Sequence, residues 1–135
     1  MTIIWNDNLK TGIAIIDEQH QTLFKTINKL SECGSDKSSF LEVLIELQAY
    51  VSKHFKTEEE YMIFIDYPGY KNHKIAHDSF VKDYKSVIKK FNSKSGITTL
   101  GPDLINLFET WIKEHYSSED VKMSDFINKA KLSVQ

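Results

Sequence analysis

Apolar residues recur along most of this chain at intervals of three and four residues, the spacing that lines one face of an α-helix. A half-buried strand would instead alternate apolar and polar residues. The stretch from 38 to 65 keeps the helical spacing along one face, at Leu44, Leu47, Val51, His54, Glu58, Tyr61 and Ile65. This pattern predicts an all-α protein.

Glycine and proline divide the chain at a few places, chiefly Gly34, Pro68-Gly69, Gly96 and Gly101-Pro102. Around these breaks the spacing predicts helices over 18–33, 38–65, 69–92 and 102–118, and a short one over 121–131. Short connections favour antiparallel neighbours. The predicted architecture is an antiparallel up-down-up-down four-helix bundle with an N-terminal arm and a short C-terminal helix.

The start of the fourth helix is predicted from local chemistry. Residues 92–101 are mostly small and polar, so we expect an exposed loop there. Pro102 suits the first turn of a helix, because the first N–H groups of a helix have no partner within it.

Size and charge set broader limits. A chain of 135 residues is expected to form one domain over 1–135. The 17 basic residues are all lysines, without arginine for paired contacts to phosphate or guanine, so no nucleic-acid partner is expected. The segment 1–12 lacks the apolar run of a secretory signal or membrane span, which predicts a cytoplasmic protein without membrane attachment. Cys33 is the single cysteine, so a metal site must use histidine and carboxylate.

All five histidines occupy positions where the helical pattern calls for an apolar residue, at His20, His54, His73, His77 and His115. A lone histidine on such a face is more often a hydrogen-bonded core residue than a metal ligand. Five on converging helices are different, since each buried imidazole without a partner would cost roughly 1–3 kcal/mol. A shared metal would satisfy all of them.

Two pairs have the spacing of chelating side chains. His54 and Glu58 are four residues apart, as are His73 and His77, so each pair projects from one helix face about one turn apart. Either spacing alone is common by chance, whereas both together with single histidines elsewhere predict a metal site. In the acidic run 58–60, only Glu58 is expected to face inward, with the rest solvated.

Asp120 follows His115 by five residues. In a regular α-helix this spacing leaves two side chains about 140° apart. We therefore expect the fourth helix to end or distort near Ser117 and Ser118, which would bring Asp120 back toward the metal. Without the histidines, Asp120 would be interpreted as a solvated cap of the fifth helix.

The order of these residues resembles that of the hemerythrin family. The matching segments are His20 in Ile-Asp-Glu-Gln-His, His54-Phe-Lys-Thr-Glu58-Glu, His73-x-x-x-His77, and Trp111-Ile-Lys-Glu-His115 with Asp120 following. The resemblance spans nearly the whole chain. Trp5 and Gly12-Ile13 also resemble the arm of bacterial members.

The resemblance implies two non-haem iron ions, bridged by carboxylates and by an oxo or hydroxo group. It assigns His73, His77 and His115 to one iron and His20 and His54 to the other. Glu58 and Asp120 would bridge both. The two-histidine iron keeps one open position, so the implied function is reversible dioxygen binding for carriage, storage or sensing, without enzymatic turnover.

Several residues beside these ligands are predicted to line a dry oxygen pocket, although each could equally be plain core. They are Leu23, Phe55, Trp111, Ile112 and Tyr116. Tyr116 departs from the aliphatic residue common in animal members, and its hydroxyl is a candidate to face the open position. We expect it to alter the stability of a ligand there.

Other classes fit less well. Lys74 stands where a zinc protease helix of the H-E-x-x-H type carries its glutamate, which excludes that class. A redox enzyme using the same centre on peroxide or nitric oxide remains the alternative, as does an iron-centre repair protein. Repair proteins of related fold usually have a cysteine-bearing N-terminal segment, which is absent here.

Overall fold

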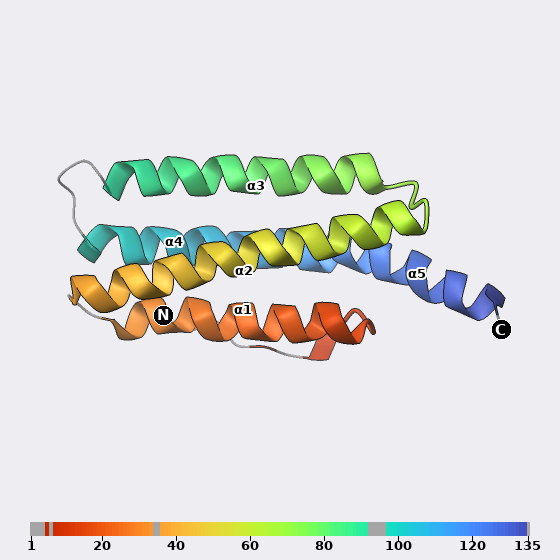
Figure 1. Cartoon of the computed structure of the whole chain (residues 1–135), viewed down its shortest axis with the longest axis horizontal. Coiled ribbons are helices and arrows are strands. Elements are labelled where there is room, and N and C mark those ends of the chain that lie inside the picture. The colour runs from red at the N-terminus through yellow and green to blue at the C-terminus, as the bar shows by residue number, and fades with distance from the viewer. Residues whose placement is uncertain (1–4, 6, 34–35, 92–96, 135) are drawn as a thin grey trace.

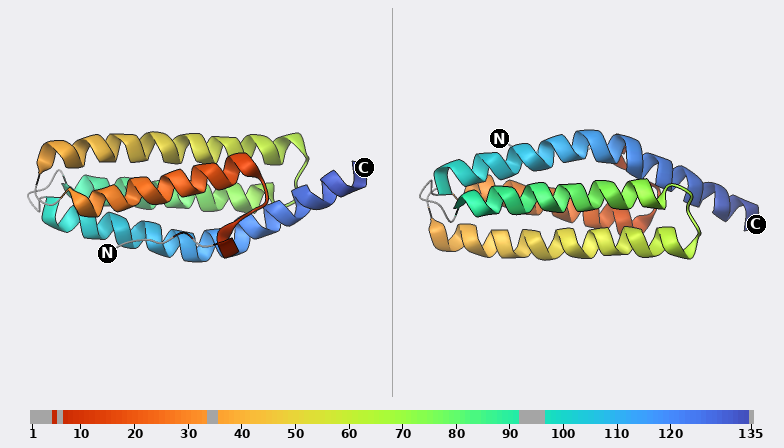
Figure 2. Two further views of the ribbon diagram at one scale, coloured as in Figure 1. Left: turned by 90° about the horizontal axis from the view of Figure 1, so that it is seen from below. Right: turned by 90° about the horizontal axis from the view of Figure 1, so that it is seen from above.

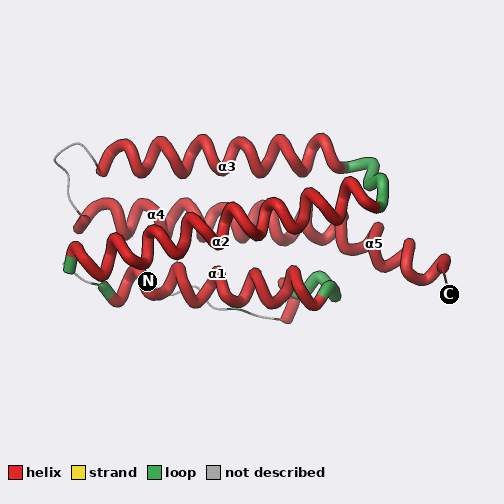
Figure 3. The backbone as a smooth tube through the Cα atoms, in the orientation of Figure 1, coloured by secondary structure: helices red, strands yellow, loops and turns green. Residues whose placement is uncertain are grey.

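The computed structural model describes residues 5, 7–33, 36–91 and 97–134, and this part of the chain is helical apart from short connections (Figures 1 and 3). Its elements are the 3-10 turn η1 (Asp7–Leu9), α1 (Ala14–Glu32), α2 (Lys37–Phe64), α3 (Tyr70–Phe91), α4 (Ile97–Trp111), the π-helical segment η2 (Ile112–Asp120) and α5 (Val121–Val134). The prediction of an all-α protein is confirmed.

The four long helices form an antiparallel bundle (Figures 1 and 2). Helix α1 packs against α2 and α4, and α3 packs against the same two helices, so neighbours in sequence are neighbours in space. This is the predicted up-down-up-down arrangement. Helix α5 continues from η2 without a break and extends past the end of the bundle (Figure 2).

The core has two apolar parts separated along the bundle axis. The larger contains Leu23, Val51, Phe80, Phe108 and Ile112, and the smaller contains Ile13, Ile16, Met62, Met123 and Ile127. On α1, His20 lies between Ile16 of the smaller part and Leu23 of the larger. The histidines thus form a polar layer between two apolar layers.

The N-terminal arm is fixed to the bundle by hydrogen bonds. The Asp17 carboxylate accepts from the backbone N–H of Thr11 at 2.7 Å and from that of Gly12 at 3.2 Å. Gly12 has a φ of 82°, a left-handed conformation that favours glycine. Asn128 of α5 donates to the Thr11 carbonyl at 3.4 Å. The arm also places the Trp5 ring edge-on against Phe24, with ring centroids 5.4 Å apart.

The start of α4 corrects one prediction. The helix begins at Ile97, so Pro102 lies inside it rather than at its start. Residues 97–101 are helical rather than a loop, and the rest of the predicted loop, 92–96, lies outside the described residues. Leu100 is only 3% exposed, and its burial contributes about 1.5–3 kcal/mol. That is comparable to the cost of about 3 kcal/mol for an interior proline.

The other boundaries differ less. Helices α2 and α3 agree with prediction to within one residue at each end. Helix α1 begins at Ala14 rather than 18, since Ile16 packs fully buried in the smaller apolar part. Helix α5 extends to Val134 rather than 131. Among the residues that the structure describes, no helix is long and apolar enough to cross a membrane.

Candidate metal centre

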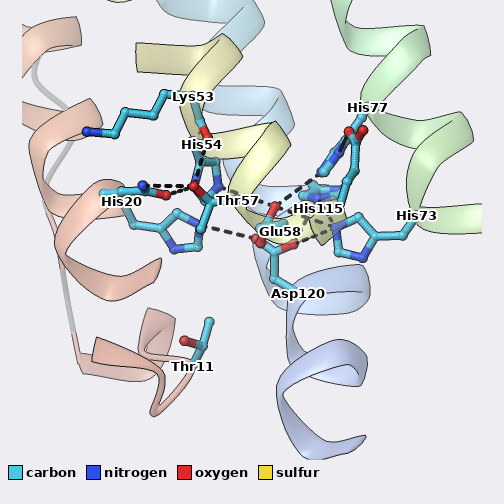
Figure 4. Close-up of polar contacts among 12 residues, drawn as sticks. Thr11, His20, Lys53, His54, Thr57, Glu58, His73, His77, His115 and Asp120 are labelled. Carbon is cyan, nitrogen blue, oxygen red and sulfur yellow. Dashed lines mark hydrogen bonds and ion pairs between the residues drawn. The ribbon is translucent and has the colours of Figure 1, made fainter. Parts of the chain in front are cut away.

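Seven polar side chains from the four-helix bundle meet in the layer between the two apolar parts (Figure 4). They are His20 from α1, His54 and Glu58 from α2, His73 and His77 from α3, and His115 and Asp120 from η2. Each is 3% exposed or less. The structure therefore brings together every residue predicted as a metal ligand, while their role as ligands stays a prediction.

The candidate ligand atoms form two groups that share one carboxylate. One group is Glu58, His73, His77 and His115, and the other is His20, His54, Glu58 and Asp120. Within each group the atoms lie within 4.8 Å of one another. We call these the three-histidine half and the two-histidine half.

The distances within each half suit a metal ion. Neighbouring donors on an octahedral ion with bonds of about 2.1 Å lie about 3.0 Å apart. Nε2 of His20 lies 2.9 Å from Nε2 of His54, and Nε2 of His73 lies 3.1 Å from Nε2 of His115. Each pair of ring nitrogens therefore faces a common point at the spacing of neighbouring metal ligands.

Asp120 faces both halves. Its Oδ1 lies 3.1 Å from Nε2 of His73 and 2.9 Å from Nε2 of His115, in the three-histidine half. Its Oδ2 lies 3.4 Å from Nε2 of His20, in the two-histidine half. One oxygen per half is the arrangement that a bridging carboxylate requires.

Glu58 is also shared between the halves. Its Oε1 lies 3.1 Å from Nε2 of His77 and 3.6 Å from Nε2 of His73. The same oxygen lies 3.3 Å from Nε2 of His54, four residues earlier on α2. Glu58 is thus central to the whole cluster.

The π-helical segment η2 explains how Asp120 reaches the cluster. Its backbone hydrogen bonds join residues five apart, so the helix is wider here and each residue turns it by a smaller angle than in an α-helix. His115 and Asp120 therefore fall on the same face, whereas a regular α-helix would separate them by about 140°. The predicted distortion near Ser117 and Ser118 is confirmed, and it begins earlier, at Ile112. Because Asp120 is 0% exposed, it is not a solvated cap.

Nδ1 of His54, the ring nitrogen that faces away from the cluster, is hydrogen-bonded to a residue that the sequence analysis did not predict. Nδ1 of His54 donates to the side-chain oxygen of Gln19 on α1 at 3.0 Å. The Gln19 amide nitrogen in turn donates to the Thr57 hydroxyl at 3.2 Å, and that hydroxyl donates to the Lys53 carbonyl at 2.9 Å. The proton on Nδ1 leaves the Nε2 lone pair directed into the cluster.

Glu59 has the equivalent role for His77 and corrects the expectation that it is solvated. Its Oε2 accepts from Nδ1 of His77 at 2.8 Å, and its side chain is only 19% exposed. Its Oε1 lies 3.7 Å from the Lys74 ammonium group. Such outer partners fix the orientation of ligand histidines. In the sequence, the only indication of this role is that Glu59 follows the predicted ligand Glu58. The packing of α3 on α2 is what brings His77 to Glu59.

Burial and mutual contact shift the pKa values in the cluster. Burial lowers the pKa of His54 to about 4, so this imidazole is neutral and its lone pair is free for a metal. Burial and Asp120 would raise the pKa of Glu58, yet His54, His73 and His77 together lower it to about 2. Burial would likewise raise the pKa of Asp120, and its neighbouring histidines lower it well below its ordinary value. Both acids are therefore carboxylates.

The cluster is incomplete without a further positive charge. Within the described residues, Glu58 Oε2 and both oxygens of Asp120 accept no hydrogen bond of ordinary geometry although they are buried. The Nε2 atoms of His20 and His54 face each other at 2.9 Å, and only one proton fits between them. Buried polar groups in native proteins nearly always have partners. Imidazole nitrogens and carboxylate oxygens gathered in two overlapping groups fit a pair of divalent cations.

Aromatic rings cover the ligand histidines. Phe55 stacks on His77 with ring centroids 3.9 Å apart and planes 3° apart, and Trp111 stacks on His115 at 3.9 Å and 15°. Tyr116 stacks on His20 at 3.9 Å and 17°. Of the other predicted pocket residues, Leu23 and Ile112 are buried in the larger apolar part. Three of the five predicted residues therefore stack on cluster histidines, and the role of all five in lining an oxygen pocket stays a prediction.

Metal uptake by the unloaded protein is expected to strengthen as pH rises. Burial by itself would lower the pKa of His73. The neighbouring carboxylates of Asp120 and Glu58 have the larger effect and raise this pKa to about 9. His73 therefore carries a proton at neutral pH that an entering metal must displace, so apparent affinity should rise up to about tenfold per pH unit below that pKa. Metal titrations across this range, with proton release followed in weak buffer, test this. Uptake that neither depends on pH nor releases protons would contradict it.

Comparison with known proteins decides the family. A family model described as the hemerythrin HHE cation-binding domain matches residues 11–127, which include all seven cluster residues. The chain belongs to the hemerythrin family. The matched range extends from the arm at Thr11 to Ile127 on α5, so this hemerythrin has the family's cation-binding domain over most of its length.

Three relatives illustrate how far the similarity extends. A bacteriohemerythrin of Clostridium acetobutylicum is 33% identical over 129 residues, covering 90% of this chain and 98% of its own. A bacteriohemerythrin of Pseudomonas aeruginosa is 29% identical over 127 residues, covering 93% and 81%. A hemerythrin-like protein of Naegleria gruberi is 30% identical over 118 residues, covering 87% of each chain. The similarity therefore extends over most of each chain.

Proposed function

We propose that this hemerythrin holds two iron ions in its cluster and binds dioxygen reversibly, as a carrier, store or sensor rather than an enzyme. The observation that carries the proposal is the unequal division of donors between the two halves. The three-histidine half has His73, His77, His115 and one oxygen from each of Glu58 and Asp120. The two-histidine half has His20, His54 and the same two carboxylates, one donor fewer.

This inequality leaves room for an outside ligand at one metal only. The three-histidine half would offer its ion five protein donors, and the two-histidine half would offer four. The two-histidine half keeps one position, which is the requirement for binding a small molecule without displacing a protein ligand.

Iron suits the donor set. Imidazole nitrogen and carboxylate oxygen bind iron well, and no thiolate lies in either group of ligand atoms. When bound, a pair of ferrous ions can lend one electron each to dioxygen and recover both on its release. The protein must then keep protons and water away from that position, because either would make the transfer irreversible.

The surroundings of the cluster meet this requirement. Every cluster residue is at least 97% buried, and stacked rings cover His20, His77 and His115. Apolar layers close the cluster above and below along the bundle axis. Gln19 and Glu59 hold the outward protons of His54 and His77, so these protons are directed away from the binding position. The chain itself therefore supplies orientation and exclusion of water.

An oxygenation cycle tests the proposal. The iron-loaded protein is reduced without air, exposed to dioxygen, and returned to inert gas while the visible spectrum and iron content are followed. We expect an absorption band that appears with dioxygen and disappears on its removal over repeated cycles, with iron retained. Rapid one-way oxidation with consumption of peroxide or nitric oxide would instead support a redox enzyme and contradict the proposal.

A further inference from the structure

The Tyr116 hydroxyl is a buried donor that the packing of the bundle does not explain. The residue is 1% exposed, and its hydroxyl has no hydrogen-bond partner among the described residues. A tyrosine in a purely packing role has no advantage over phenylalanine, because an unpaired buried hydroxyl destabilises the fold. The hydroxyl therefore suggests a partner other than the described residues, such as a bound small molecule.

The ring of Tyr116 lies over the two-histidine half. It stacks on His20 with centroids 3.9 Å apart, and its centroid is 6.5 Å from that of His54. Its neighbour in sequence, His115, belongs to the other half, with centroids 6.4 Å apart. The closest histidine is thus a ligand candidate in the half that has one donor fewer.

The Tyr116 hydroxyl can act as a hydrogen-bond donor, since a phenol carries its proton at neutral pH. A small electronegative ligand beside it would offer an acceptor that the described residues do not.

We propose that the Tyr116 hydroxyl donates a hydrogen bond to the small ligand bound at the two-histidine half, and thereby favours ligands with a terminal acceptor atom, such as dioxygen and small linear anions. This inference rests on the proposed function and adds to it a residue that sets ligand preference. Tyr116 acts on the bound ligand itself, and its stacking on His20 holds its ring beside the two-histidine half.

Azide binding to the iron-loaded, oxidised protein tests the inference. Tyr116→Phe keeps the stacked ring and removes only the donor, so azide affinity in spectroscopic titrations should fall roughly ten- to hundredfold, as for loss of a hydrogen bond to a charged group. Release of dioxygen should accelerate in parallel. Unchanged azide affinity would overturn the inference.

Tyr84→Phe is the matched control. The Tyr84 hydroxyl is also buried and has no hydrogen-bond partner in the described part of the chain, but its ring packs against Phe80 and Phe108. Its removal should leave azide affinity unchanged. A loss equal to that of Tyr116→Phe would show a general effect of buried hydroxyls and overturn the inference.

Metal-free protein gives a second readout. Since Tyr116 has no hydrogen-bond partner among the described residues, the melting temperature of unloaded Tyr116→Phe should equal or exceed that of the wild type. A clear loss would reveal a structural hydrogen bond and overturn the inference. If the variant loads iron poorly, 3-fluorotyrosine at position 116, a stronger donor of similar shape, should raise azide affinity, and no rise would overturn it. Wild-type protein that loads iron but binds neither ligand would contradict the proposed function itself.

Discussion

Replacing Glu58 with alanine is expected to prevent loading of the complete two-metal centre. Its carboxylate is shared by both groups of ligand atoms and is within 3.6 Å of the Nε2 atoms of His54, His73 and His77. Loss of an outer partner of a ligand already costs about 10- to 100-fold in metal affinity, and loss of a shared ligand should cost more. Metal content per chain after loading and desalting measures the effect.

Glu60→Ala provides the control for this variant. Glu60 is two residues away on the same helix, but its side chain is 67% exposed and lies 4.0 Å from Lys56 at the surface. Its removal should leave metal content unchanged. Full two-metal loading in Glu58→Ala would contradict the assignment of Glu58 as a bridging ligand.

Removal of the metals is expected to lower thermal stability substantially. The unloaded cluster buries two carboxylates and five imidazoles, with several atoms unpartnered. Metal that binds only the folded state stabilises it by about 4 kcal/mol at a thousandfold excess over the dissociation constant. For a chain of this size, this corresponds to a rise in melting temperature of roughly 10 °C or more.

Calorimetry of iron-loaded and chelator-treated protein measures this difference. Magnesium alone is a suitable control, because it prefers oxygen donors and retains its water, and it should restore little of the lost stability. Equal melting temperatures for loaded and chelator-treated protein would mean that metal does not stabilise the folded state, and would contradict the prediction.

The sequence predicted the fold well because its apolar spacing is regular. Helices α2 and α3 were placed within one residue, since their buried positions repeat without interruption. The start of α4 was wrong because Gly101-Pro102 favours a break locally, whereas burial of Leu100 extends the helix across it. Tertiary packing of one leucine there outweighs local preference.

The cluster residues were predictable because histidine on an apolar face stands out from its neighbours. A distortion between His115 and Asp120 was also predictable from their spacing, but its form, a π-helical segment beginning at Ile112, was not. A five-residue spacing requires only that the helix depart from regularity. The helix widens rather than breaks because α5 continues from it and packs on the bundle, with Met123 buried in the smaller apolar part.

The outer partners of the histidines were missed. Gln19 contacts His54, and Glu59 contacts His77, each across a helix–helix interface. No spacing within one helix encodes such a contact, since it depends on the rotation of one helix against the next. Glutamine and glutamate are ordinary surface residues in a sequence, so only the assembled bundle distinguishes these two.

The most direct test of the metal centre is the location of iron in crystals of the loaded protein by anomalous scattering. The account predicts two iron sites per chain, one among His73, His77 and His115 and the other beside His20 and His54, both contacted by Glu58 and Asp120. A single site, or iron bound away from these seven side chains, would contradict it.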